Sequence, residues 1–141
     1  MGGLCVVAAL GGALLATLPG SVFSLSWTHS VERTEWREEW RITDAGLTLT
    51  EARVRGTGAG MEPGADARLI DGWWVWVPSL PPQESVPLAA SGFTAEHRLC
   101  AGSDCRVLSG WMSPNATGRV GEAVTLRPCQ PGYESSSPSA P

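Results

Sequence analysis

Hydrophobic and polar positions alternate along most of the chain beyond its first two dozen residues. From Thr34 to Thr43, apolar side chains and one glutamate, Glu38, alternate with charged side chains. A period of two is typical of a strand with one buried face. Leu47–Arg55 alternates in the same way, and Asp44-Ala45-Gly46 between the two runs has the composition of a turn. Residues 34–55 are therefore predicted to form a β-hairpin.

Shorter runs of the same kind predict the remaining strands. They are Leu25–Val31, Arg68–Ile70, Trp73–Val77, Val86–Leu88, Glu96–Cys100, Arg106–Leu108 and Ala123–Arg127. Asp71-Gly72, between two of them, is a strong hairpin signal because this pair tolerates the positive φ angles of a tight turn. The pattern predicts an all-β domain, either a small β-sandwich or a partly open barrel. A β-rich α+β domain with one short helix is the alternative.

The first 25 residues have a different pattern. Residues 4–25 contain no charged side chain, and the first charged residue is Glu32. This run predicts an N-terminal apolar helix that acts as a signal peptide, cleaved after Ser24 or Ser26, or as an inner-membrane anchor. Both outcomes place the body of the protein in the periplasm or another extracytoplasmic space. The predicted organisation is a leader over residues 1–25, a single β-rich domain over 26–129 and a disordered tail over 130–141.

The cysteines suit an oxidising compartment. Cys100 and Cys105 flank a turn-forming tetrapeptide, so a hairpin would bring them together and a local disulfide is predicted. Cys129 is then left over. A bridge that uses Cys129 and a metal site built from three cysteines are the alternatives, although the spacing is poor for zinc. No metal and no cofactor is expected.

Composition narrows the classes of function. The net charge is −4, and all ten basic residues are arginines. An acidic chain lacks the basic footprint of a general nucleic-acid binder. The absence of lysine from the sequence excludes Schiff-base chemistry and a phosphate-loop lysine. Each tryptophan ring buries a large area, so most of a set of five are predicted to be core residues, whereas Trp73 and Trp111 are predicted to be exposed. The five are Trp27, Trp36, Trp40, Trp74 and Trp76.

The densest cluster of polar residues is 28–32, followed by Glu38. By alternation, His29 points the same way as the apolar side chains of its strand, and Glu38 lies between two tryptophans. A turn centred between residues 33 and 34 would place His29 opposite Glu38, which would relieve the cost of a buried carboxylate. Three interpretations stay open: a structural pair, a small-ligand or protein-contact site, and a catalytic or metal site. Ser30 is poorly placed for a triad because strand neighbours point to opposite faces.

A glycine-rich run, Gly56–Met61, follows the predicted hairpin. Its spacing is G-x-G-x-G, and Pro63-Gly64 prevents the helix that a nucleotide-binding loop requires. Its backbone N–H groups are better suited to an anion-binding nest, with Arg53 and Arg55 nearby in sequence.

Together, THSVE at Thr28–Glu32, then Glu38, then RGTGAGM at Arg55–Met61 resemble the domain-of-unknown-function family 1850. Members of that family are small bacterial proteins with an N-terminal apolar segment, often encoded beside TRAP transporters of the TAXI type. The resemblance covers residues 25–78 and brings no known activity. The candidate ligand-binding residues are His29, Ser30, Glu32, Glu38, Arg55, Gly58, Ala59 and Gly60.

The resemblance implies an extracytoplasmic accessory role near a solute transporter. The leading prediction is a non-enzymatic accessory protein for TRAP-type uptake of a small organic acid or related solute. The protein would bind the solute, the transporter's membrane subunit or its solute-binding protein, and no nucleic acid. One alternative is a periplasmic hydrolase or metal-dependent enzyme that uses His29 and a glutamate. The other is a structural module for interactions in the cell envelope. No catalytic residue is assigned.

Overall fold

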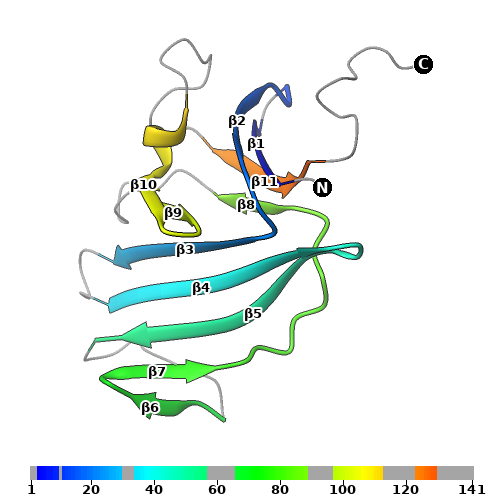
Figure 1. Ribbon diagram of the computed structural model, residues 1–141. Coiled ribbons are helices and arrows are strands. Elements are labelled where there is room, and N and C mark those ends of the chain that lie inside the picture. The colour runs from blue at the N-terminus through cyan, green and yellow to red at the C-terminus, as the bar shows by residue number, and fades with distance from the viewer. Residues whose placement is uncertain are drawn as a thin grey trace.

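The computed structural model describes residues 3–9, 11–29, 34–56, 66–88, 97–112 and 123–129, with His29 described by its backbone alone. Over these residues the chain forms two antiparallel sheets that pack together as a β-sandwich (Figure 1). The strand order is β2-β1-β11-β8 in the smaller sheet and β10-β9-β3-β4-β5-β7-β6 in the larger one. The predicted all-β fold is confirmed in its sandwich form, because the sheets do not close into a barrel.

The smaller sheet joins the two ends of the described chain. Its strands are β1 (Leu4–Ala8), β2 (Leu14–Leu18), β8 (Val86–Leu88) and β11 (Val124–Pro128). β1 lies between β2 and β11 and pairs antiparallel with both. The strands nearest the two termini are therefore neighbours in the interior of this sheet.

The predicted N-terminal apolar helix is wrong, because residues 4–25 form β1, β2 and the first half of β3. Gly11 and Gly12, within the apolar run, have φ angles of 84° and 70°. A right-handed helix cannot contain this conformation, whereas a tight turn uses it. The Ala8 N–H donates to the Ala13 carbonyl at 2.8 Å across the turn. Among the residues that the structure describes, no helix is long and apolar enough to span a membrane.

The larger sheet carries most of the predicted strands. They are β3 (Val22–His29), β4 (Thr34–Thr43), β5 (Gly46–Arg55), β6 (Arg68–Ile70), β7 (Trp73–Trp76), β9 (Arg98–Ala101) and β10 (Asp104–Val107), with a 3-10 turn, η1 (Leu108–Trp111), after β10. β4, β6 and β8 have their predicted bounds, and the other predicted strands are displaced by a few residues. Asp71 and Gly72 confirm the predicted turn, with φ angles of 52° and 86°.

The pairing of β3 with β4 differs from the predicted register. Leu25 lies opposite Glu38, and His29 lies opposite Thr34. The predicted juxtaposition of His29 and Glu38 is therefore wrong. Each residue of β4 therefore pairs with a residue four positions earlier along β3 than predicted.

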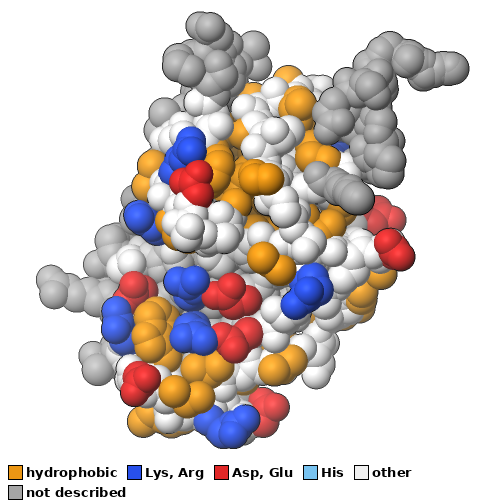
Figure 2. Space-filling model, in the orientation of Figure 1, with side chains coloured by type: hydrophobic (Ala, Val, Ile, Leu, Met, Phe, Trp, Pro, Cys, Tyr) orange, Lys and Arg blue, Asp and Glu red, His pale blue; other side chains and the backbone are white. Residues whose placement is uncertain are grey.

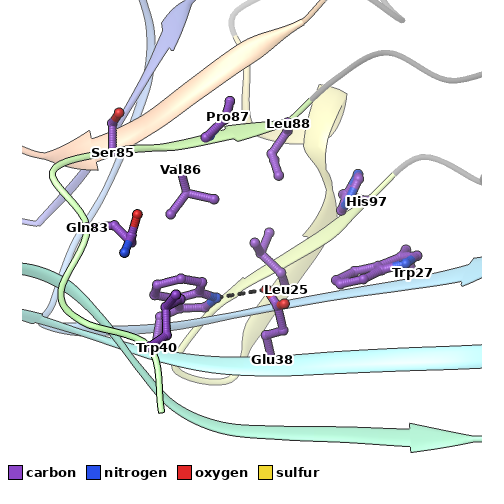
Figure 3. A pocket seen from close by; sticks show the side chains of 11 residues that line it. Leu25, Trp27, Glu38, Trp40, Gln83, Ser85, Val86, Pro87, Leu88 and His97 are labelled. Carbon is purple, nitrogen blue, oxygen red and sulfur yellow. Dashed lines mark hydrogen bonds between the residues drawn. The ribbon is translucent and has the colours of Figure 1, made fainter. Parts of the chain in front are cut away.

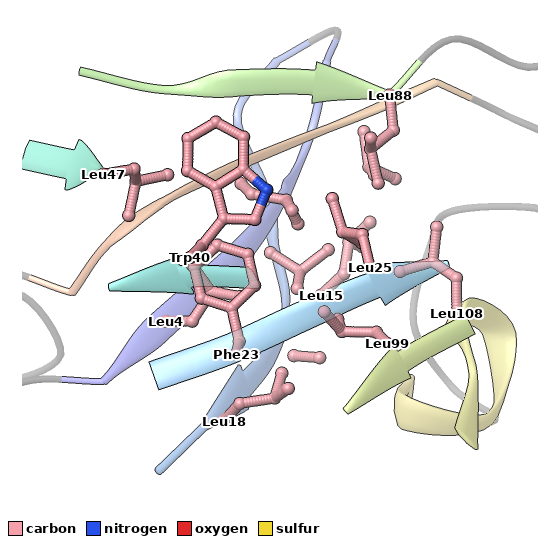
Figure 4. Packing of buried hydrophobic residues seen from close by; sticks show 14 of the residues in the cluster. Leu4, Leu15, Leu18, Phe23, Leu25, Trp40, Leu47, Leu88, Leu99 and Leu108 are labelled. Carbon is pink, nitrogen blue, oxygen red and sulfur yellow. The ribbon is translucent and has the colours of Figure 1, made fainter. Parts of the chain in front are cut away.

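Both sheets contribute to one hydrophobic core (Figure 4). The smaller sheet provides Leu4, Val6, Leu15, Leu18, Leu88, Val124 and Leu126; the larger provides Phe23, Leu25, Trp40, Leu47, Leu49 and Leu99. The rings of Phe23 and Trp40 stack with their centroids 6.1 Å apart. Trp40 is the one fully buried tryptophan, and the other six are half-buried, so fewer rings lie in the core than predicted.

All four cysteines form disulfides. Cys100 and Cys105 lie opposite each other on β9 and β10, and their predicted bond is present. Cys129 is not left over, because it is bonded to Cys5 at the other end of the sequence. Two disulfides are compatible with an extracytoplasmic location. The predicted tail, residues 130–141, lies outside the described residues.

Candidate functional site

A cleft of about 370 Å³ opens at one side of the sandwich (Figure 3). β3 and β4 form one side of it, β8 and the segment before β8 form another, and His97 enters from just before β9. The lining residues are Leu25, Trp27, Glu38, Trp40, Leu80, Gln83, Ser85, Val86, Pro87, Leu88 and His97. The wall is therefore largely apolar, with a small number of polar groups, as is usual for small-molecule sites.

Glu38 reaches the cleft because of the alternation along β4. Residues two apart on a strand share a face, so Glu38 points the same way as Trp36 and Trp40. Across the strands it lies opposite Leu25 on β3 and Ala52 on β5. A carboxyl group is thus placed on the face of the sheet that is otherwise apolar.

The surroundings of Glu38 disfavour its charged form. The side chain is half-buried, and burial raises the pKa of the Glu38 carboxyl above its ordinary value. The indole N–H of Trp40 donates to Glu38 Oε1 at 3.0 Å, and this bond lowers the pKa in part. Burial is the larger effect. In Figure 3 the indole of Trp40 and the ring of Trp27 lie on the two sides of Glu38.

Aromatic side chains surround the cleft on the β3 side. The rings of Trp27 and Trp36, opposite each other on β3 and β4, stack with centroids 6.3 Å apart. The imidazole of His97 lies on the other side of Trp27, with centroids 5.1 Å apart and planes tilted by 46°. These contacts hold the Trp27 indole at the edge of the cleft.

The wall that contains Gln83 is fixed by a close approach of two backbones. Leu47 and Gln83 exchange two hydrogen bonds, of 2.7 and 2.8 Å, in an isolated bridge. Gly46 makes this approach possible, since a Cβ there would lie 2.5 Å from the Gln83 carbonyl oxygen. Its φ angle of 123° is also one that side chains rarely adopt.

A family model described as a domain of unknown function (DUF1850) matches residues 23–108. The chain belongs to this family. Comparisons with curated proteins and with solved structures each gave no match.

The DUF1850 match contains every residue that lines the cleft, from Leu25 to His97. β1, β2 and β11 lie outside it, as do both cysteines of the Cys5–Cys129 bond. The cleft thus belongs to the DUF1850 portion of the sandwich, and most of the smaller sheet is contributed by the flanking sequence.

The structure places only part of the predicted site. Glu38 lines the cleft, and the His29 backbone ends β3 opposite Thr34. Ser30, Glu32, Gly58, Ala59 and Gly60 lie outside the described residues, so the predicted anion-binding nest does too.

Arg55 is not brought together with Glu38. It lies on the outer face of the larger sheet, where its guanidinium pairs with Glu35 at 2.5 Å and lies 4.6 Å from the ring centroid of Trp73. Similar pairs follow on this face, Arg37 with Glu39 and Arg53 with Glu51. Figure 2 shows these alternating basic and acidic side chains over β4 and β5. This face is the solvated charged face that the alternation predicts.

Gln83, Ser85 and His97 are polar lining residues that the sequence reasoning missed, and His97 is the one that the pattern could have revealed. Its signal was present, because His97 lies two positions before Leu99, which is fully buried, and so shares its face in an extended chain. Trp27 and Trp40 were predicted, but as core rather than as walls of a site. Among the described residues, no three His, Cys, Asp or Glu side chains gather closely enough to hold a metal ion.

Proposed function

We propose that this protein is an extracytoplasmic, non-enzymatic binding module that holds a small, partly apolar solute in the cleft between its two sheets. The observation that carries the proposal is the half-buried carboxyl of Glu38, set between Trp27 and Trp40 in a cleft of about 370 Å³. Sites for small molecules combine apolar walls with a few polar groups in this way, and typically measure about 300–1,000 Å³.

The two disulfides support the extracytoplasmic part of the proposal. The link to a TRAP-type uptake system rests on what the resemblance to the family implies. In that setting the module binds the transported solute, or binds the transporter's membrane subunit or solute-binding protein with the solute in place. An enzyme that pairs His29 with Glu38 loses geometric support, because His29 lies opposite Thr34. Glu32 lies outside the described residues.

The proposal is tested by filling the cleft. Val86 points into it from β8 (Figure 3), so Val86→Phe adds volume where the solute would lie. Val107→Phe is the matched control, because Val107 is exposed on β10 and does not line the cleft. The full oxidised chain is screened by thermal shift against small amines, alcohols, amino acids and dicarboxylates. A ligand at 100 times its Kd adds about 2.7 kcal/mol to stability.

We expect a selective rise in melting temperature that Val86→Phe abolishes and Val107→Phe retains. The same screen with the solute-binding protein of the transporter tests the accessory role. If only that protein raises the melting temperature, and Val86→Phe leaves this rise unchanged, the module binds through a protein-contact surface rather than through the cleft. The absence of any shift would overturn the binding proposal.

A further inference from the structure

We infer that the cleft selects an organic cation: an ammonium group against the Glu38 carboxylate, with an apolar body along the wall formed by Val86 and Leu88. This inference rests on the proposed function and specifies its ligand. It departs from the small organic acid that is the leading prediction from the sequence.

Charge is the first argument. Glu38 is the one acidic side chain among the lining residues, and none of them is an arginine; the one basic group there, the His97 imidazole, packs against the ring of Trp27. No described arginine forms an ion pair with Glu38. Its neighbour on the strand, Arg37, lies on the other face and pairs with Glu39. A carboxylate ligand would meet a like charge in a partly desolvated site, which is unfavourable, whereas an ammonium group would supply the missing countercharge.

The second argument is the arrangement of rings beside Glu38. Bulky aromatic rings beside a carboxylate exclude water from an ion pair formed there, and a less screened ion pair is stronger. Trp27 and Trp40 both line the cleft, on the two sides of the carboxyl group (Figure 3). The Trp40 indole N–H engages Oε1, which orients the carboxylate so that Oε2 can accept from a donor on the ligand. A cation at this position is therefore recognised by the carboxylate charge, and the rings on its two sides shield the ion pair from water.

The third argument is the size and character of the rest of the cleft. Leu25, Val86 and Leu88 provide apolar contacts, and the volume of about 370 Å³ suits a small molecule rather than a peptide. Gln83 and Ser85 lie at the side away from Trp27 in Figure 3. They are placed to bind a polar group at the other end of a ligand whose ammonium lies at Glu38.

Three probes with the same six-carbon body test the inference: n-hexylamine as a cation, hexan-1-ol as a neutral molecule and hexanoate as an anion. Binding is measured by calorimetric titration of the full oxidised chain near pH 8, where the amine is protonated and carboxylates are ionised. The variants are Glu38→Gln, which keeps the size and an oxygen acceptor for Trp40, and Glu39→Gln. Glu39 is the matched control because it adjoins Glu38 in sequence but lies on the outer face.

We expect hexylammonium to bind at least tenfold more tightly than hexan-1-ol, and hexanoate more weakly than both. Glu38→Gln should reduce the affinity for hexylammonium about tenfold or more and leave that for hexan-1-ol unchanged, whereas Glu39→Gln should change neither. Equal or tighter binding of the alcohol or the acid to the native chain would overturn the cation inference and leave cleft binding in place. If none of the three probes binds, both the cation inference and the proposed binding function are contradicted. The comparison of probes on the native chain does not depend on how either variant folds.

Discussion

Cys5 in β1 is covalently bonded to Cys129 just after β11, although 124 positions separate the two residues in the sequence. The bond lies beside the antiparallel pairing of these strands, where Leu4 is opposite Pro128. It therefore closes nearly the whole described chain into a single loop and fixes the two central strands of the smaller sheet to each other.

This bond should contribute more to stability than the local one. On the chain-entropy model, a loop of this length corresponds to about 5 kcal/mol, against about 2 kcal/mol for the short loop between Cys100 and Cys105. Replacing both members of each pair by serine avoids free thiols. We expect the Cys5→Ser/Cys129→Ser protein to lose more free energy of unfolding in urea than the Cys100→Ser/Cys105→Ser protein. Equal losses would show that the long loop does not constrain the unfolded chain as argued.

The same packing leads to a second prediction, for the mature protein. The sequence predicts that residues 1–25 are removed as a signal peptide. That prediction conflicts with the structure, in which these residues form part of the packed sandwich. Cleavage would take away β1, β2, Cys5 and half of β3. We expect the intact mass of protein isolated from its natural compartment to include residues 4–25. A mature N-terminus at residue 25 or 27, in a folded protein, would contradict this.

Glu38 gives a prediction about pH. Because the pKa of Glu38 is raised in the folded state, the folded chain binds this proton more tightly than the unfolded chain. The free energy of unfolding should therefore fall as pH rises from the ordinary glutamate value of 4.5 through the raised pKa. Glu38→Gln removes this loss, so we expect the variant to be more stable than the native chain near pH 8, with a smaller difference near pH 4.

The measurement is urea denaturation across this range, with Glu39→Gln as the control. Glu38 faces Leu25 and Ala52 across the strands, and His97 is the other titratable side chain that lines the cleft among the described residues. A Glu38→Gln protein that is less stable than the native chain near pH 8 would contradict the account of Glu38.

Gly46 gives a prediction about the wall of the cleft. In Gly46→Ala the new Cβ would lie 2.5 Å from the Gln83 carbonyl oxygen, at a φ angle that alanine rarely adopts. We expect a loss of about 1–3 kcal/mol in the free energy of unfolding, with weaker binding of hexylammonium because Gln83 is displaced. Gly102→Ala is the control: its φ angle is also positive, but its Cβ would meet nothing within 4 Å. It should cost about 1 kcal/mol and leave binding unchanged.

The larger sheet was predictable because its strands have one solvated face. β4 alternates between the tryptophan-rich face and the charged face, so its bounds and the inward direction of Glu38 follow from period two alone. The register with β3 could not be derived in this way. If β3 is displaced by four residues along β4, every side chain stays on its own face of the sheet. The pattern of apolar and polar positions therefore fits both Leu25 and His29 as the residue opposite Glu38.

The N-terminal strands were not predictable because they lack that alternation. Leu4, Cys5, Val6 and Val7 are all buried, and a strand buried on both faces is a continuous apolar run, like a helical leader. The partner of Cys5 lies at the far end of the sequence, so local spacing could not reveal it. The cleft depends on β8 and His97 as well as on Glu38, and these meet only through the packing of the two sheets.

The most direct test of binding in the cleft is a titration with hexylammonium followed through the indole N–H signals of the seven tryptophans by nuclear magnetic resonance. Each signal is assigned with a Trp→Phe variant. We predict that the signals of Trp27 and Trp40 shift in a saturable way, while those of Trp73, on the outer face, and Trp111, which donates to the Leu99 carbonyl at 2.8 Å, do not. Saturable shifts at Trp73 or Trp111 with none at Trp27 and Trp40 would contradict the account.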